Sequence, residues 1–322
     1  MAIKRKIIIG YQGTPQGRDA LALGEVFAKI LDAHPVGATV PLIATVLPWS
    51  KQLMGPSDLE AALRVETAEP FAAVRDQLRE LDPETRAIAN HSPSAALNEL
   101  AAEEQASLIV VGSTHRGAIG RALVGSVGQG LFHGAPSAVA IAPRGYAGQD
   151  ERHLTRIGIA FDGSAEASAA LETAIQLAER VHARLVVLTV AEPGHYGFAA
   201  AASVLTAAEL HDIEREEKQR ALDLALDRVP ESVPVEGRLL TGSPGRLLAE
   251  VSEELDLIVT GSRGYGALRR TALGSVAGHL VNSAACPVMV LPRAAGTDPL
   301  GMAPATLEGR PASSPRPDER AT

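Results

Sequence analysis

The chain has 322 residues, of which 46% are apolar and 21% charged, a composition typical of folded globular proteins and not of disordered or fibrous ones. This length favours two domains over one. The net charge of −8 argues against nucleic-acid binding as the main function, and no apolar run approaches the roughly 20 residues that a membrane span needs. The single cysteine, Cys286, excludes an internal disulfide and fits the reducing cytoplasm, where we expect the protein to be located.

Strands and helices are expected to alternate along the first half. The short apolar run Ile7–Tyr11 has the pattern of a buried strand, and the periodic apolar residues after it predict a helix. A second strand is expected at Thr39–Val46. Ser57 and Glu60 have the spacing of a capping box, which predicts the start of the next helix, and Pro70 predicts a break in it.

The first half closes with a longer unit that contains a glycine-rich loop. A short third strand is expected at Arg86–Asn90. The segment Ser107–Pro143 then has the pattern of a strand, a glycine-rich loop, a helix and a final strand at Ser137–Ala142. The pair Gly125 and Ser126 stands where the loop meets the helix.

The second half repeats this order of elements. A second capping box, Thr206 with Glu209, is in register with the first. The closing unit again contains a strand, a glycine-rich loop, a helix and a strand, and it spans Asp256–Pro292. The other strands are expected at Ile157–Phe161, Leu185–Val190 and Val235–Leu240, with the last strand of the closing unit at Val288–Leu291.

The two closing units share one register, which indicates a tandem duplication. Gly112 matches Gly261, and the pair Gly125 and Ser126 matches Gly274 and Ser275. We therefore expect one domain in residues 1–147 and a second in residues 148–293. Residues 294–322 are rich in proline, glycine and alanine without apolar periodicity, and we expect them to be disordered.

The glycine-rich loop of the second half has the composition of a phosphate-binding loop. Glycine lets a ligand approach the main chain closely, and Gly261, Gly264 and Gly274 recur along the loop. Ser275 is expected to cap the next helix, whose first N–H groups favour an anion. The simpler interpretation is that the glycines only form a tight turn between strand and helix.

These residues resemble a known signature. Gly261-x-x-Gly264, nine residues and then Gly274-Ser275 is similar to the ATP-binding motif of the universal stress protein family. The strand Ile157–Phe161 followed by Asp162 resembles the first strand of that family and its aspartate that contacts adenosine. The resemblance covers both halves and leaves out only the tail.

The resemblance implies two tandem α/β domains of the flavodoxin-like, adenine nucleotide alpha hydrolase-like type. Each would have a five-stranded parallel sheet in the order 3-2-1-4-5 with helices on both faces, and the fifth strands of the two domains would pair. ATP is the implied cofactor, and a magnesium ion could accompany it. The implied ligand contacts are Asp162, Gly163, Ser164, Val190, Gly261, Ser262, Arg263, Gly264, Gly274, Ser275 and Val276 in the second half, and Gln12, Gly13, Val46, Gly112, Gly125 and Ser126 in the first.

The first half departs from the family pattern at two positions. Gln12 stands where Asp162 stands, so an acceptor is kept but the negative charge is lost. His115 stands where Gly264 stands and adds a side chain to the loop. The tighter nucleotide site is therefore expected in the second half. Loop arginines that could neutralise phosphates are Arg121, Arg269 and Arg270.

Three functions stay open from the sequence. The first is an ATP-binding regulator or sensor in a stress response. The second is a slow ATPase or autokinase with Ser126 or Ser275 as phosphate acceptor, although no second acid accompanies Asp162 to hold a metal or act as a base. The third is an interaction scaffold without nucleotide. The expected partners are an adenine nucleotide, the other half of the same chain and a second copy in a homodimer, with neither nucleic acid nor membrane.

Overall fold

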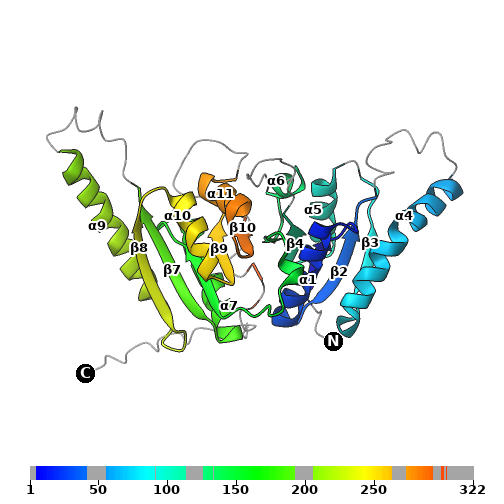
Figure 1. Cartoon of the computed structure of the whole chain (residues 1–322), viewed down its shortest axis with the longest axis horizontal. Helices are drawn as coiled ribbons and strands as arrows, with labels where there is room; N and C mark the ends of the chain where they lie inside the picture. The colour runs from blue at the N-terminus through cyan, green and yellow to red at the C-terminus, as the bar shows by residue number, and fades with distance from the viewer. Residues whose placement is uncertain are drawn as a thin grey trace, which may run out of the picture.

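A computed structural model of the chain describes residues 5–41, 56–90, 92–113, 126–132, 134–192, 206–262, 273–292, 299–300 and 302. Strands and helices alternate throughout these residues, and the strands join into one ten-stranded sheet with helices on both faces (Figure 1). None of the helices in these ranges is both long and apolar enough to cross a lipid bilayer.

The first half contributes five strands to this sheet, which are β1 to β5. Its longest helix, α4, continues through Pro70, so the predicted break at that proline is wrong. Ser57 lies inside α4 instead of capping it. The elements are β1 (Lys6–Gly10), α1 (Pro15–Leu31), β2 (His34–Thr39), α4 (Pro56–Gln77), η1 (Arg79–Leu81), β3 (Glu84–Ala87), α5 (Pro93–Glu103), β4 (Leu108–Gly112), α6 (Ser126–Leu131), β5 (Ala138–Ala142) and η2 (Tyr146–Gly148).

The second half repeats the arrangement with strands β6 to β10. The predicted capping box of α9 is confirmed, because the Thr206 hydroxyl accepts from Glu209 N at 3.2 Å and Thr206 N donates to Glu209 Oε2 at 2.7 Å. The elements are β6 (Arg156–Ala160), α7 (Ala165–Val181), β7 (Arg184–Ala191), α9 (Ala207–Leu226), β8 (Val235–Thr241), α10 (Pro244–Val251), η3 (Ser252–Glu254), β9 (Leu257–Gly261), α11 (Ser275–Ser283) and β10 (Val288–Leu291).

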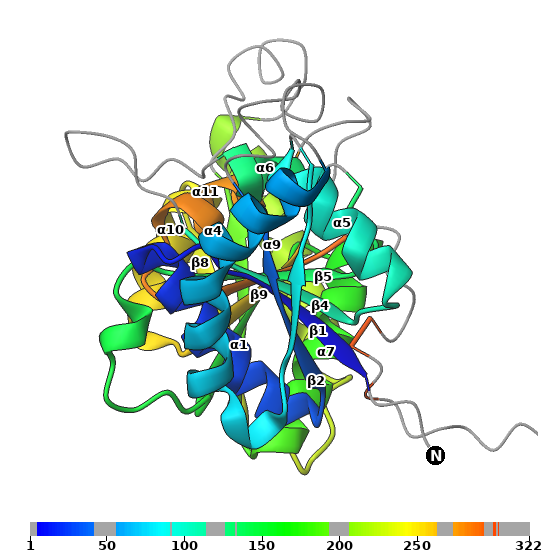
Figure 2. The ribbon, with the colours of Figure 1, turned by 90° about the vertical axis from the view of Figure 1, so that its right-hand side faces the viewer.

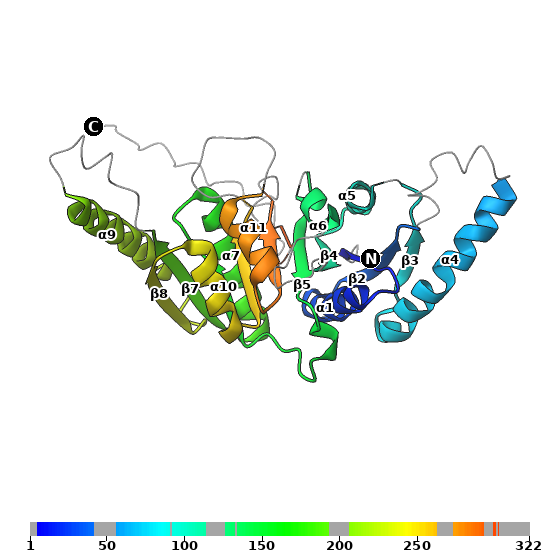
Figure 3. The same ribbon diagram turned by 45° about the horizontal axis from the view of Figure 1, so that its top comes forward.

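The strand order of the sheet is β3-β2-β1-β4-β5-β10-β9-β6-β7-β8. Each half therefore has the predicted order 3-2-1-4-5 with parallel neighbours. The halves join where β10 runs antiparallel to β5, with Met289 opposite Ala140, which confirms the predicted pairing of the fifth strands. Figure 3 shows β5 and β10 facing each other at the centre, with α4 and α9 at the two far ends.

The core has two layers, one on each face of the sheet. Ile7 and Ile9 point to the layer covered by α1, α4, α7 and α9, and Ile8 points to the layer covered by α5, α6, α10 and α11. Figure 2 shows the same division in the first half, with α1 and α4 on one side of the strands and α5 on the other. Because the strands are buried on both faces, they are continuous apolar runs.

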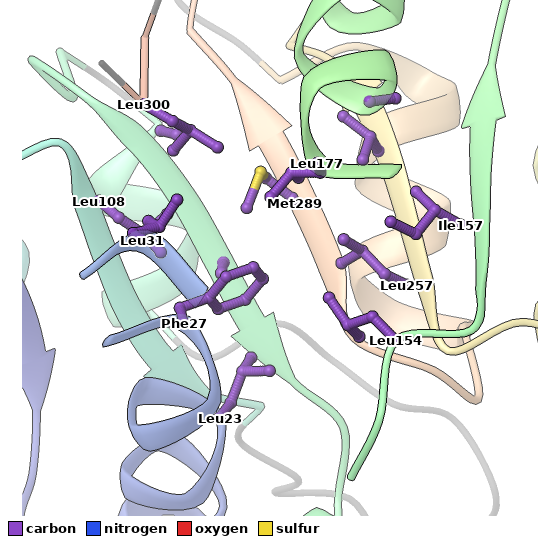
Figure 4. Close-up of a cluster of buried hydrophobic side chains, with 14 of the residues drawn as sticks. Leu23, Phe27, Leu31, Leu108, Leu154, Ile157, Leu177, Leu257, Met289 and Leu300 are labelled. Carbon is purple, nitrogen blue, oxygen red and sulfur yellow. The ribbon is translucent and has the colours of Figure 1, made fainter. Parts of the chain in front are cut away.

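The layer under α1 and α7 is shared by both halves. Phe27 and Leu31 of α1, Leu177 of α7 and Met289 of β10 belong to one buried cluster (Figure 4). The two halves are therefore packed against each other, not only joined through the sheet.

The second strand lies earlier than predicted. We expected Thr39–Val46, but β2 spans His34–Thr39 and pairs in parallel with β1, with Val36 opposite Ile8. Pro35 and Gly37 disfavour a strand in isolation, which is why the pattern was missed. Tertiary packing requires the glycine, because a β-carbon on Gly37 would lie 2.7 Å from a methyl group of Val74 in α4.

The predicted disorder from residue 294 onward is wrong at Leu300. This side chain is fully buried and belongs to the same cluster as Leu31 and Met289 (Figure 4). Met302 packs against this cluster. Among the residues after Pro292, only 299, 300 and 302 are described. The chain thus returns to the core after its last strand.

Candidate functional site

The strand order places a candidate site at the carboxyl ends of β6 and β9. These strands are neighbours, with Ile159 opposite Val259, and the helices that follow them lie on opposite faces of the sheet. In parallel α/β sheets such a point, where the direction of strand addition changes, is where ligands bind. The ends of β1 and β4 are the equivalent place in the first half.

Asp162 is fixed at the end of β6 by a tight turn. Its Oδ1 atom accepts a hydrogen bond from Ser164 N at 2.9 Å, and Gly163 between them has a φ of 88°, which suits glycine. The Ser164 hydroxyl accepts from Ala167 N at 3.1 Å and so caps α7. The three predicted residues therefore form one rigid corner, in which the half-buried carboxylate still has acceptor sites for a ligand.

Lys218 of α9 reaches the same corner. Its Nζ atom donates to the Asp162 carbonyl oxygen at 3.1 Å, which places an ammonium group beside the loop. Sequence reasoning missed this residue. The signal was present, because Lys218 stands one helical turn before Leu222, which is 3% exposed, so it lies on the inward face of α9.

Val190 lies where the resemblance placed it, in β7 beside the corner. Ala160 is opposite Leu188, so the register brings Val190 level with Asp162 two residues later. The side chain of Val190 is half-buried and packs against the core layer under α10 and α11.

Gly261 at the end of β9 is explained by helix packing. A β-carbon there would lie 3.0 Å from Glu166 Cβ and 3.2 Å from the carbonyl carbon of the same residue in α7. The missing side chain lets the first turn of α7 approach the strand end. The simpler interpretation of this glycine is therefore favoured by the structure, although its main chain still lies at the site.

The loop after β9 is closed at its base. Ser262 N donates to Leu291 O at 2.9 Å, and Gly274 N donates to Ser262 O at 2.8 Å, so the two ends of the loop meet. Arg263, Gly264, Arg269 and Arg270 lie between them and outside the described residues. The closed base brings the start of α11 to the end of β9.

The helix α11 begins without a side-chain cap. Gly274 is the N-cap residue, with no side-chain cap bond, and Ser275 is the first helical residue and exposed. The predicted capping role of Ser275 is therefore wrong. The N–H groups of Ser275 and the half-buried Val276 lie in the first turn, where unsatisfied donors and the helix dipole favour an anion.

The first half has a different arrangement at the equivalent place. The Gln12 amide Nε2 donates to Val40 O at 2.8 Å, so it reaches across to the end of β2 instead of closing a turn as Asp162 does. Gly10 is opposite Ala38, which brings Val40 level with Gln12. Val40, not Val46, is thus the counterpart of Val190; Val46 lies outside the described residues, as do Gly125, His115 and Arg121.

The remaining first-half residues serve mainly to pack helices against strand ends. A β-carbon on Gly112 would lie 2.0 Å from Gln16 O, so α1 approaches β4 even more closely than α7 approaches β9. Ser126 is the first residue of α6, as Ser275 is of α11. Gly13 has a φ of 29° in the turn after β1.

The two halves carry opposite charges beside this turn. In the first half, Oε2 of Glu69 in α4 lies 4.0 Å from where a β-carbon on Gly13 would be. In the second half, the corresponding helix α9 brings the ammonium group of Lys218 instead. The second half thus has a cation beside this turn where the first half has a carboxylate.

The sequence matches one protein family twice. The model of the universal stress protein family matches residues 4–143 and 153–292. A universal stress protein of Mycobacterium tuberculosis is 29% identical over 303 residues, which cover 89% of this chain and 99% of the relative. One from Mycolicibacterium smegmatis is 30% identical over 282 residues, with 84% of this chain and 86% of the relative covered.

A solved structure has the same fold over nearly the whole length. The crystal structure of a universal stress protein from Archaeoglobus fulgidus superposes with a TM-score of 0.61 at 19% identity, covering 89% of this chain and 98% of its own. The duplicated match, the full-length relatives and the shared fold agree with the strand order and the two equivalent loops. The chain belongs to the universal stress protein family.

Proposed function

We propose that the second half binds ATP at the ends of β6 and β9 and that this binding makes the protein a regulator or sensor in a stress response. The observation that carries the proposal is that Asp162 and Lys218, which are joined at the end of β6, lie beside the end of β9, where the bond from Gly274 N to Ser262 O holds the uncapped start of α11. The Asp162 carboxylate only accepts hydrogen bonds, whereas Lys218 and the start of α11 favour negative charge. An adenine nucleotide has this polarity, with donors on its base and ribose and a negative charge on its phosphates.

The residues present fit the parts of ATP. The Asp162 carboxylate would accept from the amino or hydroxyl groups of adenosine. The main-chain N–H groups of Ser275 and Val276 would face the phosphates, and Lys218 would offset part of their charge. The choice of ATP among adenine nucleotides comes from the resemblance of the glycine motif to the family signature.

The first experiment is to denature the purified protein and identify any nucleotide that it releases. ATP released intact supports the proposal, since a regulator binds its nucleotide without consuming it. Released ADP would point to slow turnover or autophosphorylation instead. A protein that carries no nucleotide and binds none on titration would be a scaffold, and the proposal would be wrong.

The second experiment separates the two halves by calorimetry. Asp162→Ala removes the charged acceptor and should weaken the tighter ATP site, whereas the matched change Gln12→Ala should leave that site unchanged. A charge-assisted hydrogen bond is roughly twice as strong as a neutral one, so the loss at Asp162 should be about tenfold. Loss of the tighter site on Gln12→Ala would show that it lies in the first half.

Two expectations from the sequence stay predictions. A cytoplasmic location can be checked by fractionation. A homodimer can be checked by sedimentation of the purified chain. In the described structure β5 and β10 already pair with each other, so a homodimer would have to use another surface.

A further inference from the structure

A pocket opens among the carboxyl ends of β1, β2 and β4 in the first half. Its volume is about 90 Å³, and its walls are mainly apolar. Tyr11, Ala38 and Val111 line it from the strands, and Leu97 of α5 and Val127 of α6 line it from the helices. A site of this kind suits a small ligand or the apolar end of a larger one.

The polar groups around the pocket bond mainly to one another. Gln12 Nε2 donates to Val40 O at 2.8 Å, and both residues line the pocket. The Thr39 hydroxyl donates to Tyr11 O at 2.8 Å, and the Thr14 hydroxyl accepts from Gly17 N at 3.1 Å. A ligand that enters therefore finds these strand-end groups already paired, and it gains most by burying apolar surface.

The charges near the pocket do not favour a phosphate group. Glu69 lies beside Gly13, the neighbour of the lining residue Gln12, where the second half has Lys218. Burial raises the pKa of Tyr11, and the charges of Arg18 and Glu69 act on it in opposite directions. The positive charge of Arg18 is thus offset by the carboxylate of Glu69, so a highly anionic ligand gains little there.

We propose that this pocket is a second binding site, which takes a small, uncharged and mainly apolar molecule instead of a nucleotide. Gln12 sets the specificity, because its amide donates to Val40 O, the carbonyl that a hydrogen-bond donor of a nucleotide would otherwise use. The site does not depend on nucleotide binding in the second half. A single chain would then respond to two chemically different ligands.

Indole is a suitable probe, because it is small, uncharged and mainly apolar. Binding is followed by NMR titration of the full-length protein, and a fragment of this size should bind with a Kd of about 1 mM. Val127→Trp is the blocking variant, because Val127 lines the pocket and the new side chain is itself an indole. Val276→Trp is the matched control, since each valine follows the first serine of its helix, α6 or α11.

Val127→Trp should weaken indole binding at least about tenfold and leave ATP affinity unchanged, whereas Val276→Trp should leave indole binding unchanged. Saturating ATP should not displace indole from the unaltered protein. This test uses no variant, so it still applies if Val127→Trp does not fold. The proposal is overturned if indole does not bind saturably, if ATP displaces it, or if Val276→Trp weakens it as Val127→Trp does. A protein that binds indole but no nucleotide would contradict only the proposed function.

Discussion

At the residue scale, a change at Lys218 tests the proposed phosphate recognition separately from adenosine recognition. Its ammonium group lies 3.1 Å from the Asp162 carbonyl oxygen, beside the corner where phosphates would be attracted. Lys218→Met keeps most of the apolar stem and removes the charge. We expect ATP affinity to fall by about fivefold to tenfold and adenosine affinity to stay unchanged, with the difference shrinking at high salt. Equal losses for the two ligands in calorimetry would show that the lysine acts on the loop and not on phosphate.

Gly274 gives a second residue-scale prediction. Gly274→Val places a branched side chain at the start of α11, where the phosphates would approach the main chain. Losing two or three donor contacts at roughly 0.5–1.5 kcal/mol each should weaken ATP binding about tenfold or more. Gly278→Ala is the control in the same helix, because its new β-carbon would only touch Leu273 at 3.7 Å. If the folded Gly274→Val variant binds ATP as tightly as the Gly278→Ala variant, the phosphates do not lie at the start of α11.

At the element scale, the chain segment after β10 stabilises the fold through Leu300. Its side chain is fully buried in the core layer shared by both halves. Leu300→Ala should lower the free energy of unfolding by about 2–5 kcal/mol, as other buried leucine deletions do. Truncation after Met302 is the control and should change the free energy little, because disorder was predicted for the removed residues. Urea unfolding measures both, and equal stability of all three proteins would refute the anchoring role.

The elements also show how far the sequence could predict this structure. The alternation of strands and helices and the duplication followed from the repeated pattern, because they depend on local periodicity and on a shared register. The strand order, the pairing of the fifth strands and the interest of Asp162 came from the resemblance to the universal stress protein family. The strand β2 did not follow, because Pro35 and Gly37 are held in it by packing against β1 and α4. Lys218 and the bond from Gln12 to Val40 were missed for a related reason. Both join residues far apart in the chain, and such contacts exist only once the strands and helices are placed.

At the scale of the whole molecule, the two halves should unfold together. They share a β-ladder between β5 and β10 and one buried core layer that contains Phe27, Leu177 and Met289. Calorimetry should therefore show one transition whose van't Hoff and calorimetric enthalpies agree. Two separate transitions would mean that the junction is too weak to couple the halves. Saturating ATP should raise the midpoint of the single transition as a whole.

The antiparallel ladder between β5 and β10 has a further consequence for how the protein behaves on dilution. If two single-domain chains met through such a ladder, their association would weaken as the protein became scarce, because it would depend on two molecules meeting. Here the partner strand is tethered to the same chain, so its effective concentration is set by the linker and not by expression level. The paired state is then available to a cell at any copy number. Each half can also carry substitutions that the other does not share. An example is Gln12 in the first half, which stands where the second half has Asp162.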